Sequence, residues 1–135
     1  MIEKENIVAV YGTLKKWFWN HRTMEWAQWE FIRVDYIPFT ELASCWYPMM
    51  KFDDASSKKF IEVELYKVDD RGVLDYLDRL EGYPSLYIRK KVTTLLWEES
   101  VVVYQINSDI RDTSDNYKIE TPTEVTEEWE YFSWK

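Results

Sequence analysis

The stretch Asn6-Ile-Val-Ala-Val-Tyr11-Gly12-Thr13-Leu14 carries a clear structural signal near the start of the chain. The short apolar and β-branched run Asn6–Tyr11 predicts a buried strand, and Gly12 ends it in a tight loop. At such a strand end, the residues Tyr11–Leu14 would present successive backbone N–H groups. A loop of this kind can bind a carboxylate or a developing oxyanion, although the pattern alone favours an ordinary turn after a strand.

Further strand patterns follow along the chain. Phe31–Phe39 alternates between two faces, which is the period of a half-buried strand. Lys59–Val68 alternates as well, and an assumed bulge places its inward positions at Phe60, Val63, Leu65 and Tyr66. Tyr87–Trp97 and Val101–Ile106 predict two more strands, joined as a hairpin by residues 98–100.

One amphipathic helix is predicted after the strand at Lys59–Val68. Asp69–Gly72 provides a turn and a helix N-cap, and the helix ends near Glu81 because Gly82 follows. Its apolar side chains recur at helical spacing, at Val73, Leu74, Leu77 and Leu80. Strands together with one helix predict an α+β domain on a small mixed, largely antiparallel sheet or β-barrel.

Length and composition limit the kind of protein this is. The chain has 135 residues and 24 aromatic side chains, so we expect one folded domain over residues 1–135. The net charge of −8 disfavours nucleic acid and anionic membranes as partners. No secretory signal or membrane span is predicted, and one cysteine with one histidine cannot build a zinc site unaided. These features favour a cytoplasmic protein.

Residues 107–135 form an acidic C-terminal extension. This stretch is polar until a closing aromatic cluster, which consists of Trp129, Tyr131, Phe132 and Trp134. Two interpretations are open at this point. Either the aromatic side chains pack back on the body of the domain, or the extension is mobile.

Glu81 is the strongest candidate for an acid or base. It lies in the last turn of the predicted helix, where the helix dipole disfavours an anion, and its neighbours are largely apolar. Apolar surroundings raise the pKa of a carboxyl group, which would suit Glu81 to proton transfer near neutral pH. The alternative is a solvated surface glutamate.

Several segments together resemble the gamma-glutamylcyclotransferase-like superfamily. The resemblance is carried by Val8–Lys16 and Leu77–Pro84, and it continues through Glu64–Asp69 and Tyr87–Val92. The Tyr-Gly-Thr-Leu-Lys-Lys start is similar to the gamma-glutamylamine cyclotransferase, or AIG2-like, branch. Across residues 7–106 the order and spacing of these segments match the family pattern.

This resemblance implies a fold, a reaction and a site. It implies a small mixed β-barrel with flanking helices and a small-molecule gamma-glutamyl substrate that is converted to 5-oxoproline, with no metal or cofactor. The backbone N–H groups of Tyr11, Gly12, Thr13 and Leu14 would hold the gamma-glutamyl head group. Glu81 would be the catalytic acid and base, and Tyr87 would lie near the pocket.

Two positions depart from the family pattern. Trp17 and Val63 stand where the family usually has glycine, and each adds bulk near the expected pocket. A second hypothesis is therefore a catalytically inactive member that binds a small ligand or a protein partner. A purely structural module is the least favoured interpretation, because it would leave Glu81 and Gly82 without a purpose.

Overall fold

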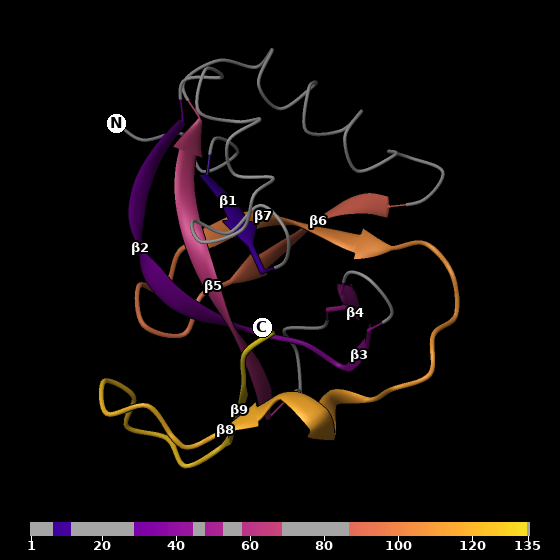
Figure 1. Ribbon diagram of the computed structural model, residues 1–135. Helices are drawn as coiled ribbons and strands as arrows, with labels where there is room; N and C mark the ends of the chain where they lie inside the picture. Colours follow the sequence, from indigo (N-terminus) through magenta and orange to yellow (C-terminus); the bar gives the residue numbers. More distant parts are fainter. Residues whose placement is uncertain (1–6, 12–28, 45–47, 53–57, 69–86, 135) are drawn as a thin grey trace.

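The computed structural model describes residues 7–11, 29–44, 48–52, 58–68 and 87–134 (Figure 1). The described strands form a mixed seven-stranded sheet and a separate two-stranded sheet. The larger sheet contains β1 (Ile7–Val10), β2 (Trp29–Pro38), β5 (Lys59–Val68), β6 (Tyr87–Thr93), β7 (Ser100–Ile106), β8 (Lys118–Ile119) and β9 (Glu130–Phe132). The smaller sheet contains β3 (Glu41–Ser44) and β4 (Pro48–Lys51), and a short 3-10 helix, η3, spans Ser114–Tyr117.

The long strand β5 organises the larger sheet. One of its edges pairs with β2, and its other edge pairs with β9 at one end and β1 at the other. β1 is antiparallel to β5 and parallel to β7, and all four of its residues are buried. This confirms the buried strand predicted from the apolar run. β6 and β7 form the predicted hairpin, and β7 links it to β1. The first strand of the hairpin ends at Thr93 and not at the predicted Trp97, so the connection is residues 94–99.

The main hydrophobic core lies on the inner face of the sheet. Alternate residues of β1, β5 and β7 contribute to it, namely Ile7, Ala9, Ile61, Val63, Leu65, Val101 and Val103. The bulge assumed in β5 is absent, because the pairing shift lies in β2, between Phe31 and Arg33. As a result Phe60 and Tyr66 are buried on the opposite face from Val63 and Leu65, where Phe60 joins a second, smaller cluster.

A closed barrel is not detected among the described strands. The larger sheet follows the open order β6-β7-β1-β5-β9-β8, with β2 attached to β5. The predicted helix ending near Glu81 lies outside the described residues, so flanking helices are not shown. No helix in the described part of the chain is long and apolar enough to cross a membrane.

A buried carboxylate joins β2 to the turn between β6 and β7. Asp35 is fully buried, and its two oxygens accept hydrogen bonds from three backbone amides. The donors are the N–H groups of Tyr36 at 2.7 Å, Leu96 at 2.9 Å and Trp97 at 2.9 Å. These bonds, together with one from Leu95 N–H to the Tyr36 carbonyl at 2.9 Å, attach the turn to the strand.

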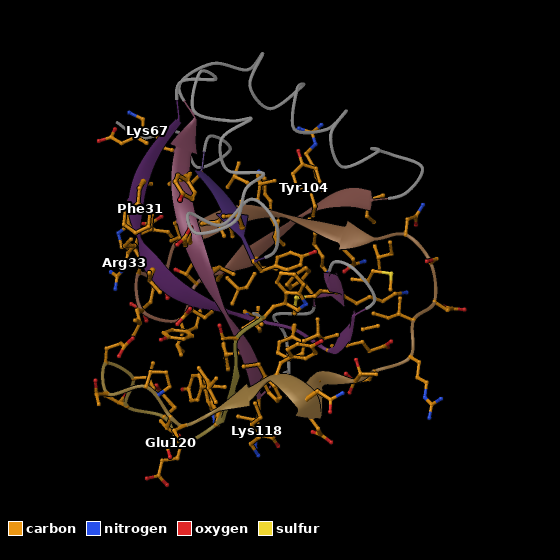
Figure 2. The ribbon with its side chains drawn as sticks, viewed as in Figure 1. Phe31, Arg33, Lys67, Tyr104, Lys118 and Glu120 are labelled. Carbon is orange, nitrogen blue, oxygen red and sulfur yellow. The ribbon has the colours of Figure 1, made fainter. Side chains whose placement is uncertain are left out.

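On the outer edge of β2, beside Asp35, the Arg33 side chain contacts the main chain of its own strand. Arg33 Nε donates to the carbonyl oxygen of Val34 on its own strand at 3.2 Å, and it lies 3.9 Å from Asp35 Oδ2. Phe31 and Val34 are the exposed large apolar side chains of the described residues. Phe31 and Arg33 are labelled along this outer edge in Figure 2.

Asp35→Asn is expected to lower the free energy of unfolding by about 2–4 kcal/mol. The Asn side chain keeps one acceptor oxygen, but its NH₂ group is itself a donor. It would face a backbone N–H group that now donates to the second carboxylate oxygen, and that N–H group would lose its acceptor. Urea unfolding followed by tryptophan fluorescence measures the loss. Asp109→Asn is the matched control, because Asp109 is an exposed carboxylate paired with Lys51 at 3.8 Å. Equal midpoints for the two variants would contradict the structural role of Asp35.

The acidic extension packs back on the body of the domain, as the first of the two interpretations predicted. β9 adds to β5 in parallel, and Phe132 lies fully buried with its ring edge-on to Phe39 at 5.1 Å. On the other face, Trp129 stacks on Phe60 with ring centroids 5.0 Å apart. The extension therefore supplies part of both hydrophobic clusters.

Phe132→Ala is expected to destabilise the protein by about 3–5 kcal/mol, because it leaves a cavity in the main core. Thermal unfolding by circular dichroism checks this. Phe31→Ala removes the same side chain from an exposed position, so it should cost much less. A loss for Phe132→Ala no larger than that for Phe31→Ala would show that the extension contributes little to the core.

Candidate active site

Two of the predicted site residues lie at the same end of the sheet. Because β1 and β7 are parallel, their carboxyl ends lie at the same edge, and Tyr11 directly follows β1. Tyr87 begins β6 and pairs with Ile106, the last residue of β7. The backbone of Tyr87 therefore starts close to where β1 ends. Gly12, Thr13, Leu14 and Glu81 lie outside the described residues, as does Trp17.

The side chain of Tyr11 is committed to the core. Its hydroxyl donates to the carbonyl oxygen of Tyr104 at 2.7 Å, and its ring packs edge-on against Phe52 at 5.5 Å. Only 7% of Tyr11 is exposed. Tyr11 can therefore serve the loop that follows β1 as an anchor and through its backbone, and its hydroxyl is already occupied.

Two polar side chains hold the backbone of Phe52 beside Tyr11. Phe52 N–H donates to Gln105 Oε1 at 2.9 Å, and Lys90 Nζ donates to the Phe52 carbonyl oxygen. We did not anticipate either residue from the sequence. The sequence did contain a signal. Lys90 lies two residues before buried Val92, and Gln105 lies two residues after buried Val103, so each faces the same side of the sheet as a core residue.

A buried carboxylate lies beside the same strand end, on the other face of the sheet. Glu64 pairs with Val10, is 7% exposed, and accepts a hydrogen bond from the Tyr66 hydroxyl at 2.9 Å. Burial, followed by this hydrogen bond, raises the pKa of Tyr66 above its ordinary value, so Tyr66 remains a donor. Val63, where the sequence resemblance implies a glycine, is fully buried in the core.

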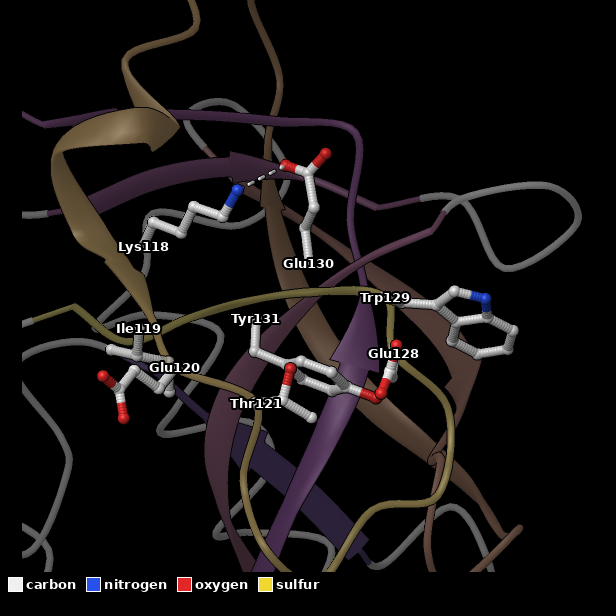
Figure 3. Close-up of a pocket in the computed structure, with 8 residues that line it drawn as sticks. All are labelled: Lys118, Ile119, Glu120, Thr121, Glu128, Trp129, Glu130 and Tyr131. Carbon is white, nitrogen blue, oxygen red and sulfur yellow. Dashed lines mark ion pairs between the residues drawn. The ribbon is translucent and has the colours of Figure 1, made fainter.

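A pocket of about 670 Å³ lies elsewhere, around β8 and β9 (Figure 3). Lys118 and Glu130 form an ion pair across it at 3.8 Å. It is lined by Lys118, Ile119, Glu120, Thr121, Glu128, Trp129, Glu130 and Tyr131. β9 and β1 pair with opposite ends of β5, so this pocket is separate from the end that holds Tyr11. Tyr11, the predicted site residue whose side chain the structure describes, does not line it.

The sequence profile of a known family matches almost the whole chain. That family is described as gamma-glutamyl cyclotransferase, AIG2-like, and the match covers residues 8–130. The chain belongs to this family. The match includes the segments around Tyr11 and Glu81, and it extends the AIG2-like resemblance beyond residue 106 into the C-terminal extension. No curated protein sequence matches the chain significantly.

Solved structures agree with this AIG2-like assignment at the level of the fold. An AIG2-like protein from Mus musculus is 22% identical with a TM-score of 0.63, over 80% of this chain and 81% of that one. An uncharacterized protein from Pyrococcus horikoshii is 23% identical with a TM-score of 0.61, over 78% and 81%. A protein specific to uropathogenic E. coli is 18% identical with a TM-score of 0.64, over 82% and 89%.

Tyr11→Phe is expected to lower the free energy of unfolding by about 1–3 kcal/mol, because the Tyr104 carbonyl would lose a buried donor. Chemical denaturation of the two proteins measures the difference. Tyr117→Phe is the control, since the Tyr117 hydroxyl has no hydrogen-bond partner among the described residues. If both variants were as stable as the native protein, the hydroxyl of Tyr11 would not be an anchor.

Proposed function

We propose that this protein is a gamma-glutamyl cyclotransferase, which releases 5-oxoproline and a free amine or amino acid from a gamma-glutamyl compound. The observation that carries the proposal is the family match over residues 8–130, because it spans both the Tyr11–Leu14 loop and Glu81. The position of Tyr11 and Tyr87 at one end of the sheet supports a site formed there.

The proposed reaction is an intramolecular aminolysis. Glu81 removes a proton from the substrate's α-ammonium group, and the free amine attacks the γ-carbonyl carbon to close a five-membered lactam. Glu81 then returns the proton to the leaving nitrogen as the C–N bond breaks, and the ring nitrogen loses its second proton to the released amine, which departs as an ammonium ion. Atoms balance without a cofactor, because nucleophile and electrophile belong to one molecule.

Positioning supplies much of the rate in such a reaction. Holding the substrate folded gives effective molarities that can reach ~10⁵ M or more. Each backbone N–H group of the Tyr11–Leu14 loop directed at the developing oxyanion would contribute on the order of 3 kcal/mol. The anchoring of Tyr11 to Tyr104 and Phe52 supports this role, since it holds the start of the loop rigidly.

The alternative is an inactive family member that binds a small ligand or a protein partner. It was motivated by Trp17 and Val63 in place of glycines. The side chain of Val63 packs in the hydrophobic core, so its added bulk is accommodated there. This weakens the alternative at one of its two positions.

Release of 5-oxoproline from a panel of gamma-glutamyl amines and peptides tests the proposal. Glu81→Gln is expected to reduce kcat by about 10²–10⁴-fold, because the amide cannot move the proton. Glu120→Gln, a change at an exposed carboxylate of the C-terminal extension, should leave the rate unchanged. No release across the panel by folded native protein would favour the inactive member instead.

A further inference from the structure

Lys90 directs a cationic side chain toward the inner face of the sheet. It pairs with Val103, and it is in phase with Val92 of the core. The side chain is half-buried, and its Nζ donates to the carbonyl oxygen of Phe52. A flexible, strongly hydrated ammonium group is an unusual choice for such a place, because burial removes water from the charge.

The charge of Lys90 is not balanced by any carboxylate of the described residues. Its hydrogen bond to the neutral Phe52 carbonyl is its one interaction there. Two lysines on other strands have acidic partners. Lys59 of β5 pairs with Asp112 at 3.1 Å, and Lys51 of β4 pairs with Asp109 at 3.8 Å. An ammonium group has three N–H donors, so Lys90 can bind an anion while it keeps Phe52.

Lys90 also lies next to the anchored start of the proposed substrate loop. The Phe52 residue that it contacts packs its ring against Tyr11, with centroids 5.5 Å apart. Three residues further toward the start of β6 is Tyr87, at the strand end where β1 and β7 also finish. Because Tyr11 begins the proposed substrate loop, the ammonium group lies beside the residue from which that loop starts.

We propose that Lys90 binds the α-carboxylate of the gamma-glutamyl head group. This inference rests on the proposed function and adds to it the group that recognises the non-reacting end of the substrate. A gamma-glutamyl compound carries an α-carboxylate that takes no part in lactam closure, and a cation is its natural partner. Lys90 would then leave the loop N–H groups available for the γ-carbonyl oxygen.

Binding of two related lactams tests the proposal without requiring turnover. 5-Oxoproline carries the carboxylate, whereas 2-pyrrolidinone is the same ring without it. The native protein should bind 5-oxoproline about 10–100-fold more tightly, which is the range for a hydrogen bond to a charged group. In Lys90→Met this preference should vanish with pyrrolidinone binding unchanged, and Lys90→Arg should restore part of it. Isothermal titration calorimetry at low salt measures both ligands.

Lys91→Met provides the matched control. Lys91 is the adjacent residue on the same strand, but it is exposed and points to the opposite face. Its removal changes the net charge equally, so it should leave the preference for 5-oxoproline intact. Circular dichroism establishes that each variant is folded.

Three outcomes would overturn the role of Lys90. These are equal weakening of both lactams in Lys90→Met, an unchanged preference in that variant, and no binding of either lactam to the native protein. Equal weakening would mean that Lys90 only holds Phe52. The proposed function is judged separately by 5-oxoproline release. If the preference for 5-oxoproline depended on Lys90 but no substrate released 5-oxoproline, the carboxylate site would stand and the enzymatic function would be rejected. If substrates released 5-oxoproline but the preference did not depend on Lys90, the enzymatic function would stand and the carboxylate site would be rejected.

Discussion

The carboxylate of Asp35 is the interaction on which the arrangement of the sheet depends. Among the described strands, β2 and β6 are not paired by backbone hydrogen bonds. The turn at residues 94–99 is instead joined to β2 by the backbone amides of Leu96 and Trp97, which donate to the buried Asp35 carboxylate. The turn in turn sets where the β6–β7 hairpin lies, and thus which side chains of the hairpin reach the core. One desolvated anion satisfied by backbone donors replaces a row of strand pairing.

The end of the sheet near Tyr11 combines the two kinds of strand pairing in this fold. The parallel contact between β1 and β7 brings two carboxyl ends together, and the antiparallel hairpin adds the start of β6 to them. Polar side chains from the hairpin then reach across to Phe52, which connects the segment after β4 to this end. Under the proposed function, the gamma-glutamyl substrate would bind where these strands converge.

The sequence predicted the strands well where burial leaves a periodic record. Ile7–Val10 and Val101–Tyr104 are uninterrupted apolar runs, and β5 alternates at the period of a strand. The inward position of Asp35 could not be predicted, because a bulge in β2 changes the face on which later residues point. The parallel pairing of β9 with β5 joins Lys59 to Glu130, and no local pattern encodes so distant a contact. For the candidate site, the place of Tyr11 at the end of β1 was predictable. The inward position of Lys90, which we propose as a ligand-binding residue, was not, because it lies in a basic run typical of a solvated surface.

The bond from Arg33 to its own strand has a consequence for colloidal behaviour. Among the described strands β2 pairs only with β5, so its other edge offers the main-chain groups that recruit strands from other molecules. The guanidinium group occupies the Val34 carbonyl, and the Tyr36 carbonyl is taken by Leu95. An incoming strand would have to displace a charged side chain to pair there, beside the exposed rings and methyl groups of Phe31 and Val34. The charge of Arg33 would therefore disfavour the addition of a further strand at this edge.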